Sequence, residues 1–433
     1  MKRALIRIAL VLLGLGLIGI ASVRWLNERG EESVTSGSVS SVASTPALVA
    51  RGAYLARAGN CMGCHTVQGS AAYAGGRGVP TPFGTIYAPN LTPDDATGLG
   101  AWSQAEFWRA LHNGRARDGR LLYPAFPYPN YTRITRDDSD AIHAYLRSLP
   151  PVVQANKPHE LPFPFDQQAA LAVWRALYFR AAEPAEPSTR EADAARGAEW
   201  QRGAYLVEGL GHCNACHASR NALGATRNTL DLAGGLIPVQ NWYAPSLTSA
   251  NEASVAGWDT GHVVALMRTG ISARGSVSGP MREVVAGSTQ HLTEPDLRAM
   301  ALYLKALPQT AAEVAPARAM PSPSPDSPGG KLYEQNCVQC HGEQGEGVAG
   351  AYPALAGSRA VTMPVTVNLA HMVLEGGFPP ATAGNPRPYG MPPFATVLSD
   401  VEVAQLLSHL RASWGNHAAP VSALDVARSR GVR

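Results

Sequence analysis

The sequence is poor in charged residues, and its few charges are unevenly placed. Asp, Glu, Lys and Arg make up 16% of its 433 residues, and the formal net charge is +3. The first 30 residues alone carry a net charge of +4, so the rest of the chain carries −1. Nucleic-acid binding requires a sustained basic surface. Since the body of the chain has none, we expect no nucleic-acid partner.

Recognisable catalytic motifs are also missing. The sequence contains no serine–histidine–acid set, no paired-carboxylate site, no phosphate-binding glycine loop and no nucleotide fingerprint. Any substrate oxidation is therefore expected to take place in another chain. The many glycines (43) and prolines (34) indicate compact modules joined by irregular connections.

No cysteine lies outside one repeated pattern. The six cysteines form three Cys-x-x-Cys-His motifs: Cys61, Cys64 and His65; Cys213, Cys216 and His217; and Cys337, Cys340 and His341. This pattern is the signature of covalent haem attachment. The two thiols bond to the haem vinyl groups, and the adjacent histidine is the proximal ligand of the iron. The sequence therefore predicts three covalently bound c-type haems.

Three other interpretations of the motifs are weaker. Paired zinc motifs are usually about 15 to 20 residues apart, whereas these motifs are 152 and 124 residues apart. A thioredoxin-like pair requires a strand–helix setting, which none of the motifs has. Disulfides form outside the cell, but they do not require a histidine after every second cysteine. Haem attachment remains the preferred interpretation.

Methionine is absent between Met62 and Met267. In the second and third repeats, Met281 and Met391 stand on loops shortly before the last helix. A thioether at that point would ligate the iron and raise its reduction potential. The alternative is an ordinary packing role, which we expect for the methionines inside predicted helices: Met267, Met300 and Met372.

The first repeat has Phe126 where the second has Met281. Phenylalanine cannot bind iron, so the first haem is expected to be five-coordinate, to hold water or to take a histidine. His112 and His143 are the candidates, although an ordinary helix histidine is the preferred interpretation of His143. We expect this haem to be spectroscopically distinct and lower in potential than the other two.

The N-terminus has the pattern of an export segment. An uncharged apolar stretch of sixteen residues, 8–23, follows three positive charges and ends at Arg24. It is slightly long for a signal-peptide core and slightly short for a spanning helix. The best cleavage position, after Ala21, is a poor match. We expect residues 1–25 to be an anchor, or a signal peptide, that places the body of the chain outside the cytoplasm.

The first two repeats are duplicated modules. The sequence RGAYL occurs at 51–55 and 202–206, and YAPNLT at 87–92 matches YAPSLT at 243–248. A match in this order and spacing indicates an internal repeat. The third repeat shares Leu332-Tyr333, the cysteine motif and a closing helix.

Each repeat is expected to end on an amphipathic helix, because apolar residues recur at helical spacing near 142, 297 and 403. Ser103 with Glu106 and Ser399 with Glu402 have the spacing of capping boxes. The predicted domains are 46–180, 196–310 and 329–417, with a proline-rich linker at 311–328.

The chain resembles the cytochrome c subunits of membrane-bound dehydrogenases, including those of alcohol, aldehyde and gluconate dehydrogenases and of molybdenum hydroxylases. The resemblance covers about residues 46–417. The motifs that carry it are TPFGTIYAPNLTPD at 81–94, YPAFPY at 123–128, STQHL at 288–292, MPPF at 391–394 and SWGN at 413–416. It implies an all-α chain of three tandem class I cytochrome c-like domains after the N-terminal segment, with Met281 and Met391 as iron ligands.

The resemblance also implies a function. Such a subunit takes electrons from a catalytic subunit that contains flavin, pyrroloquinoline quinone or molybdopterin, and passes them to ubiquinone or a terminal oxidase. Phe126 departs from the methionine common in alcohol dehydrogenase members, which favours the hydroxylase-type or aldehyde-type branch. The alternatives are a c-type haem peroxidase using an open first haem, and an accessory subunit of a terminal oxidase.

Overall fold

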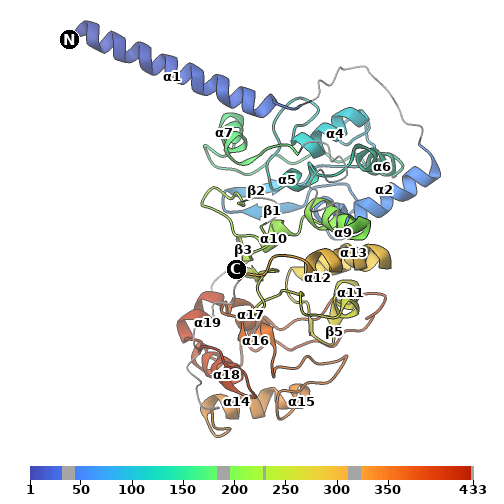
Figure 1. The fold of residues 1–433 in the computed structure, drawn as a ribbon, viewed down its shortest axis with the longest axis vertical. Helices are drawn as coiled ribbons and strands as arrows, with labels where there is room; N and C mark the ends of the chain where they lie inside the picture. The colour runs from blue at the N-terminus through green and yellow to red at the C-terminus, as the bar shows by residue number, and fades with distance from the viewer. Residues whose placement is uncertain (32–43, 183–195, 228–230, 311–322, 431–433) are drawn as a thin grey trace. The chain divides into compact units, whose positions relative to one another are not determined.

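The computed structural model of the protein describes residues 1–31, 44–182, 196–227, 231–310 and 323–430 (Figure 1). Most of the expected linker, residues 311–322, lies outside these described residues. The chain divides into two compact units. Unit 1 comprises residues 1–55, 64–187 and 221–225, and unit 2 comprises residues 56–63, 188–220 and 226–433.

The N-terminal part of the chain contains a long first helix, shorter helices and one hairpin. Its elements are α1 (Lys2–Glu28), α2 (Pro46–Ala58), α3 (Cys61–His65), β1 (Gly78–Thr81), β2 (Gly84–Tyr87), α4 (Gln104–Asn113), α5 (Tyr128–Tyr131), α6 (Arg136–Arg147) and α7 (Gln168–Tyr178).

The next part, up to residue 310, repeats this order with two hairpins. Its elements are α9 (Gly197–Ala204), the π-helix η1 (Tyr205–Leu210), α10 (Asn214–His217), β3 (Gly235–Ile237), β4 (Trp242–Ala244), α11 (Thr260–Thr269), β5 (Ile271–Ser272), β6 (Gly275–Ser276), α12 (Met281–Gly287), the 3₁₀-helix η2 (Thr289–His291) and α13 (Glu294–Lys305).

The described C-terminal part is helical. Its elements are α14 (Pro328–Asn336), α15 (Val338–His341), α16 (Arg359–Thr362), α17 (Val367–Glu375), α18 (Asp400–Ala412) and α19 (Ala423–Arg430). The described chain is therefore mostly helical, as predicted. The three antiparallel hairpins β1–β2, β3–β4 and β5–β6 were not predicted.

The predicted closing helices are present as α6, α13 and α18, and both predicted capping boxes are formed. The Ser103 hydroxyl accepts from the Glu106 backbone N–H at the start of α4, and Ser399 accepts from Glu402 at the start of α18. The glutamate side chain bonds back to the serine N–H in both cases. Each box satisfies N–H groups that have no partner within the helix.

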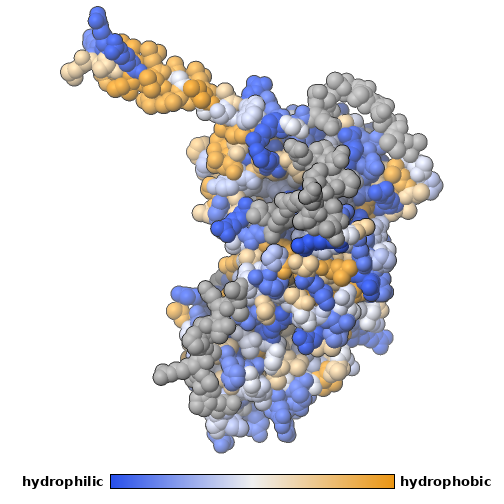
Figure 2. All heavy atoms as spheres, in the orientation of Figure 1, coloured by the Kyte–Doolittle hydropathy of each residue, from blue (hydrophilic) through white to orange (hydrophobic). Residues whose placement is uncertain are grey.

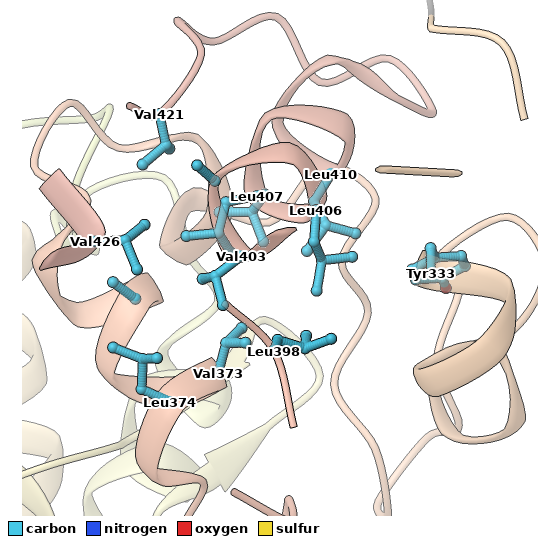
Figure 3. Packing of buried hydrophobic residues seen from close by; sticks show 13 residues of the cluster. Tyr333, Val373, Leu374, Leu398, Val403, Leu406, Leu407, Leu410, Val421 and Val426 are labelled. Atoms are coloured by element: carbon cyan, nitrogen blue, oxygen red, sulfur yellow. The ribbon is translucent and has the colours of Figure 1, made fainter. Parts of the chain in front are cut away.

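The apolar face of α18 forms the centre of the C-terminal core (Figure 3). Val403 and Leu407 are fully buried there, and Leu374 from α17 and Val426 from α19 pack against them. Burying a side chain of this size stabilises a fold by about 1.5–3 kcal/mol. The spacing of these residues along α18 places them on one helical face, which is why the sequence pattern located the helix.

A glycine lies at each crossing between a motif's preceding helix and its closing helix. A Cβ atom at Gly52 would lie 1.8 Å from the Ala141 carbonyl oxygen. The corresponding distances are 2.0 Å for Gly203 to Ala299 and 2.3 Å for Gly329 to Gln405. No real Cβ makes such contacts, so each pair of helices approaches more closely than any other residue would permit. An ion pair adds to two of the crossings, Arg51 with Asp138 (2.6 Å) and Arg202 with Asp296 (2.8 Å).

Replacing Gly203 with alanine is expected to destabilise unit 2. The added methyl group would force α9 and α13 apart, and overpacking of this kind costs about 1–3 kcal/mol. Gly257→Ala is the matched control, because no atom of the described residues lies within 4 Å of a Cβ there. Thermal unfolding followed by circular dichroism measures both variants. Equal unfolding midpoints for the two would contradict the prediction.

Candidate haem-binding sites

Each Cys-x-x-Cys-His motif ends on a short helix whose last residue is the histidine: α3, α10 and α15. Both cysteines of the first motif lie in the helix, whereas Cys213 and Cys337 are the N-cap residues of α10 and α15. The two sulfurs and the imidazole of each motif are therefore held within five consecutive residues. Burial raises the pKa of the Cys213 thiol to about 12 and that of Cys337 to about 11. Both thiols are therefore uncharged at physiological pH. A sulfur in a thioether bond to haem is uncharged as well.

The three motif histidines share one hydrogen bond. In each, Nδ1 lies within hydrogen-bond distance of the backbone carbonyl of a proline. The distances are 2.8 Å from His65 to Pro89, 2.7 Å from His217 to Pro245 and 3.0 Å from His341 to Pro353. Because a carbonyl can only accept, Nδ1 must carry the proton. The lone pair of Nε2 is then left for a metal, which is the usual way in which a second hydrogen bond orients a ligating histidine.

The surroundings also keep these imidazoles neutral. Burial lowers the pKa of His65 to about 4, and the hydrogen bond to Pro89 opposes this shift. Burial lowers the pKa of His217 and of His341 as well, against the same kind of bond. Neutral imidazole is the form that binds a metal, so no proton must be displaced near pH 7.

A glycine joins the histidine to the proline-bearing loop in all three motifs. The backbone N–H groups of Gly75, Gly234 and Gly347 donate to the carbonyls of the three histidines at 2.8, 2.9 and 2.8 Å. All three glycines have positive φ, of 78°, 81° and 66°. A Cβ at Gly75 would lie 2.5 Å from the Pro89 carbonyl carbon. Glycine is required because the returning loop passes directly over this position.

The sequence analysis missed these three glycines. They follow their histidines by 10, 17 and 6 residues, so no common spacing marks them. The repeated Tyr-Ala-Pro at 87–89 and 243–245 was noticed, and its proline supplies the carbonyl in the first two motifs. The repeated Tyr-Ala-Pro was therefore visible in the sequence. The hydrogen bond that its proline accepts could be seen only in the folded loop.

Met391 lies beside the third motif. It lines one hollow together with Cys337, and the other residues of this hollow are Asn336, Val373, Phe394, Leu398 and Leu406. Its backbone pairs with Gly377, with N–H to carbonyl distances of 2.8 and 2.9 Å. The backbone on both sides of the thioether is thus held at the edge of an apolar space next to an attachment cysteine.

Met281 lies at the start of a helix and not in a loop as the sequence predicted. It is the first residue of α12, directly after Gly279-Pro280. Gly279 has a φ of 53°, and a Cβ there would lie 2.6 Å from the ring of Trp242. The left-handed glycine stands directly before Pro280, which occupies the N-cap position of α12 without a capping hydrogen bond. This helix was missed because its seven residues make only about two turns, too few to repeat an apolar pattern.

Phe126, at the position of Met281 in the first repeat, lies among aromatic rings. Its ring centroid is 5.4 Å from that of Tyr131 and 6.4 Å from that of Tyr128. His112 is buried on α4, where its ring stacks on Trp108 at 4.5 Å. These contacts describe an aromatic cluster where the second repeat has its methionine.

His143 is buried on α6, with its ring centroid 5.2 Å from that of Phe107. Burial and the charge of Arg147 lower its pKa to about 4, against a hydrogen bond to the Trp102 backbone. Its Nε2 is buried and has no hydrogen-bond partner among the described residues. This histidine is therefore held neutral at physiological pH.

Comparison with known proteins agrees with this geometry. The cytochrome c family model matches residues 49–150 and 327–414. The fold and the motif histidines thus define a c-type cytochrome, a class of protein that binds haem covalently.

Similar proteins narrow the class. The chain is 36% identical over 406 residues to the cytochrome c subunit of alcohol dehydrogenase (quinone) from Gluconacetobacter polyoxogenes, covering 89% of this chain and 84% of that protein. It is 37% identical to the gluconate 2-dehydrogenase cytochrome c subunit of Pantoea cypripedii, covering 89% of this chain and 90% of that protein. It is 41% identical to one of the subunits of nicotinate dehydrogenase from Pseudomonas putida, covering 84% of this chain and 30% of that protein. The chain belongs to the family of dehydrogenase cytochrome c subunits.

The buried neutral state of His143 predicts acid sensitivity. Its pKa is about 4 in the fold and about 6.5 when unfolded, so only the unfolded state takes up a proton between these values. Stability should therefore fall as the pH is lowered from about 6.5 to about 4, by at most about 3 kcal/mol. His143→Leu should reduce this loss, measured as the free energy of unfolding across that pH range.

The exposed His417, changed to leucine, is the matched control for His143→Leu. The prediction is wrong if the two variants change the pH dependence equally.

Proposed function

We propose that the chain is a three-haem electron carrier, which accepts electrons from a catalytic dehydrogenase subunit and delivers them to ubiquinone or another respiratory acceptor. The observation that carries this proposal is the bond from Nδ1 of each motif histidine to a proline carbonyl, made three times with distances of 2.7–3.0 Å. Because the same bond leaves Nε2 of all three imidazoles unprotonated, we infer three iron ligands. Membership of a family of dehydrogenase cytochrome c subunits supports the direction of electron flow.

Each haem is assigned to one motif. The two cysteines bind the porphyrin and the histidine binds iron from one side. The proposed attachment and proximal residues are Cys61, Cys64 and His65; Cys213, Cys216 and His217; and Cys337, Cys340 and His341. The chemistry is that of the iron, while the protein sets its potential, exposure and spacing.

Met281 and Met391 are proposed as the sixth ligands of the second and third haems. The shared hollow of Met391 and Cys337 supports this assignment for the third haem. For the second haem, the support is the position of Gly279, two residues before Met281, against the ring of Trp242 at the start of β4. A histidine–methionine pair raises the potential and closes the iron to outside ligands.

The first haem is proposed to lack a methionine ligand and to have the lowest potential of the three. Phe126 and its aromatic neighbours support this proposal, since none of them supplies a thioether. An open iron alone does not make a peroxidase. None of the three relatives named above is called one.

The domains are proposed as 46–180, 196–310 and 329–417, joined by the segments between them. Three observations of the same kind support this division. The crossings at Gly52, Gly203 and Gly329 each bring a preceding helix and a closing helix together around one motif.

The first helix is proposed to anchor the chain, with the body in the periplasm. α1 is 27 residues long and strongly apolar, and none of its residues is buried (Figure 2). A helix of this length rises about 40 Å, enough to cross a bilayer. It continues without interruption through Ala21, the best cleavage position.

The last turn of α1 and the residues just after it are bonded to the rest of unit 1. Asn27 donates to the Ala172 carbonyl (2.9 Å) and accepts from Arg175 (2.9 Å), and Glu31 pairs with Arg115 (2.9 Å). The periplasmic placement rests on the basic residues at the other end of the helix.

Purification from native membranes tests the carrier function. The chain should co-purify with a catalytic subunit that contains flavin, pyrroloquinoline quinone or molybdopterin, and three haems per chain should be measured as haemochrome. Ethanol, acetaldehyde, gluconate and nicotinate are then added in turn. One of them should reduce the haems, and a soluble ubiquinone analogue should reoxidise them. Haems that no donor reduces through the co-purified subunit would refute the carrier, and a different haem count would refute the three sites.

Changing Phe126 to methionine should supply the missing thioether. We expect the lowest of the three midpoint potentials to rise towards the other two, because a thioether favours the ferrous iron. A redox titration in detergent measures this change. Phe126→Leu, which keeps the volume without the sulfur, should leave the potential low. An equal rise in both variants would mean that packing and not ligation sets the potential.

A further inference from the structure

Helix α17 of the C-terminal repeat makes contacts on two faces. One face packs into the core of that repeat through Ala370, Val373 and Leu374 (Figure 3). The other carries Asn368, which is half-buried, and His371, which is 2% exposed. Polar groups withdrawn from water require partners, and α17 finds them on the preceding repeat.

These partners belong to strand β4 and the residue before it. The Tyr243 backbone N–H donates to the Asn368 side-chain oxygen at 2.8 Å, and the Asn368 side-chain nitrogen donates to the Tyr243 carbonyl at 2.7 Å. One side chain thus pairs with both backbone groups of Tyr243, as a neighbouring strand would. His371 Nε2 donates to the Asn241 carbonyl at 3.1 Å, and its ring stacks on Trp242 with centroids 5.0 Å apart.

Strand β4 is in turn linked to both proposed ligands of the second haem. Two residues after Tyr243, the Pro245 carbonyl accepts the hydrogen bond from His217. The Trp242 ring lies against Gly279, two residues before Met281. The contact with α17 therefore bears on the two segments that would hold the second iron.

The far end of α17 meets the proposed ligand of the third haem. A Cβ at Gly376, directly after the helix, would lie 2.2 Å from the Met391 carbonyl oxygen. Gly377 pairs with Met391 through two backbone hydrogen bonds. The Val373 carbonyl within α17 accepts from the Phe394 N–H at 3.0 Å. One nine-residue helix is therefore bonded to the loop of Met391 and to β4.

In the first repeat, the equivalent strand is β2, and its backbone groups are paired by a different part of the chain. There the Tyr87 N–H donates to His159 Nδ1 at 3.1 Å, and Thr85 pairs with Glu160 through backbone bonds of 3.0 and 2.9 Å. These partners come from the segment after the same repeat's own closing helix. The second repeat instead takes its partner at Tyr243 from the third.

We propose that α17 holds the second and third haems as one fixed redox pair, with Asn368 and Trp242 as the positioning residues for electron transfer between them. The inference rests on the proposed three-haem function. Asn368 sets the position of β4 against α17, and Trp242 fills the space between α17 and the Gly279 turn. Neither residue is a proposed iron ligand. Each acts through the backbone that carries the ligands.

Asn368→Asp is the main test because it is isosteric. It keeps the acceptor for the Tyr243 N–H but replaces the donor to the Tyr243 carbonyl with a second acceptor, which repels that carbonyl. Trp242→Phe is the second variant and removes part of the stacking with His371. Asn156→Ala is the matched control, because it removes two comparable bonds in unit 1, to the Asn90 N–H (2.7 Å) and the Thr97 carbonyl (3.0 Å).

Pulsed electron paramagnetic resonance on the full-length oxidised chain measures the distances between ferric irons. The wild type should show one narrow distance for the second and third irons, and both variants should broaden it. Electron equilibration after a light-driven pulse of reduction should slow in both, because the rate of electron transfer falls as the distance between the two irons grows. The control should leave this distance and this rate unchanged.

Haem content and reduction by the dehydrogenase partner separate this inference from the function on which it rests. A wild type without three haems, or without reduction by a partner, would refute the function. If that function holds but Asn368→Asp and Trp242→Phe keep the wild-type distance and rate, the fixed pair is refuted. An equal change in Asn156→Ala would also refute it, because the effect would then not depend on α17.

Discussion

The structure depends on one hydrogen bond, from Nδ1 of each motif histidine to a proline carbonyl. The bond determines which nitrogen carries the proton, and so which one can face the iron. To make it, the chain must return to the histidine after 24, 28 and 12 residues in the three motifs. The first two loops return through hairpins, and the third returns through a shorter turn closed by the Val348–Tyr352 bridge. Loops of different length and structure therefore all bring a proline carbonyl to the Nδ1 atom of the motif histidine.

Features that arise from neighbouring residues were predictable from the sequence. The capping boxes need only a serine and a glutamate three positions apart, and the closing helices need only apolar residues on one face. The haem motifs are equally local, since two thiols and an imidazole lie within five consecutive residues. The position of Met391 on a loop shortly before the closing helix was also predictable, because the start of that helix is marked by the capping box at Ser399.

Features that arise from distant contacts were not predictable. The hairpin strands have two to four residues, too few for an alternating pattern, and β1 contains Pro80. Their pairing follows from the return of the loop to the histidine and not from strand propensity. Of 43 glycines, the three beside the histidine carbonyls could not be singled out, because their need for positive φ exists only once the proline loop lies over them.

The π-helix η1 shows how the second repeat keeps its geometry despite a change in length. Gly52 precedes Cys61 by nine residues, whereas Gly203 precedes Cys213 by ten. Both glycines must lie at a helix crossing and both cysteines at a motif, so the extra residue has to be absorbed between them. The wider turn does this, with the Gly211 N–H bonding to the carbonyl of Leu206, five residues earlier, at 2.7 Å.

The strand edge at Tyr87 and Tyr243 shows the same principle at the level of repeats. A buried backbone N–H and carbonyl must be paired, whichever part of the chain supplies the partner. An asparagine side chain carries one acceptor and one pair of donors, so it can replace a strand's peptide group. A helix bearing Asn368 can therefore cover an edge that elsewhere needs an extended segment. The hydrogen-bonding requirement is common to the two repeats, but the partner that satisfies it differs, and this difference brings α17 into contact with β4.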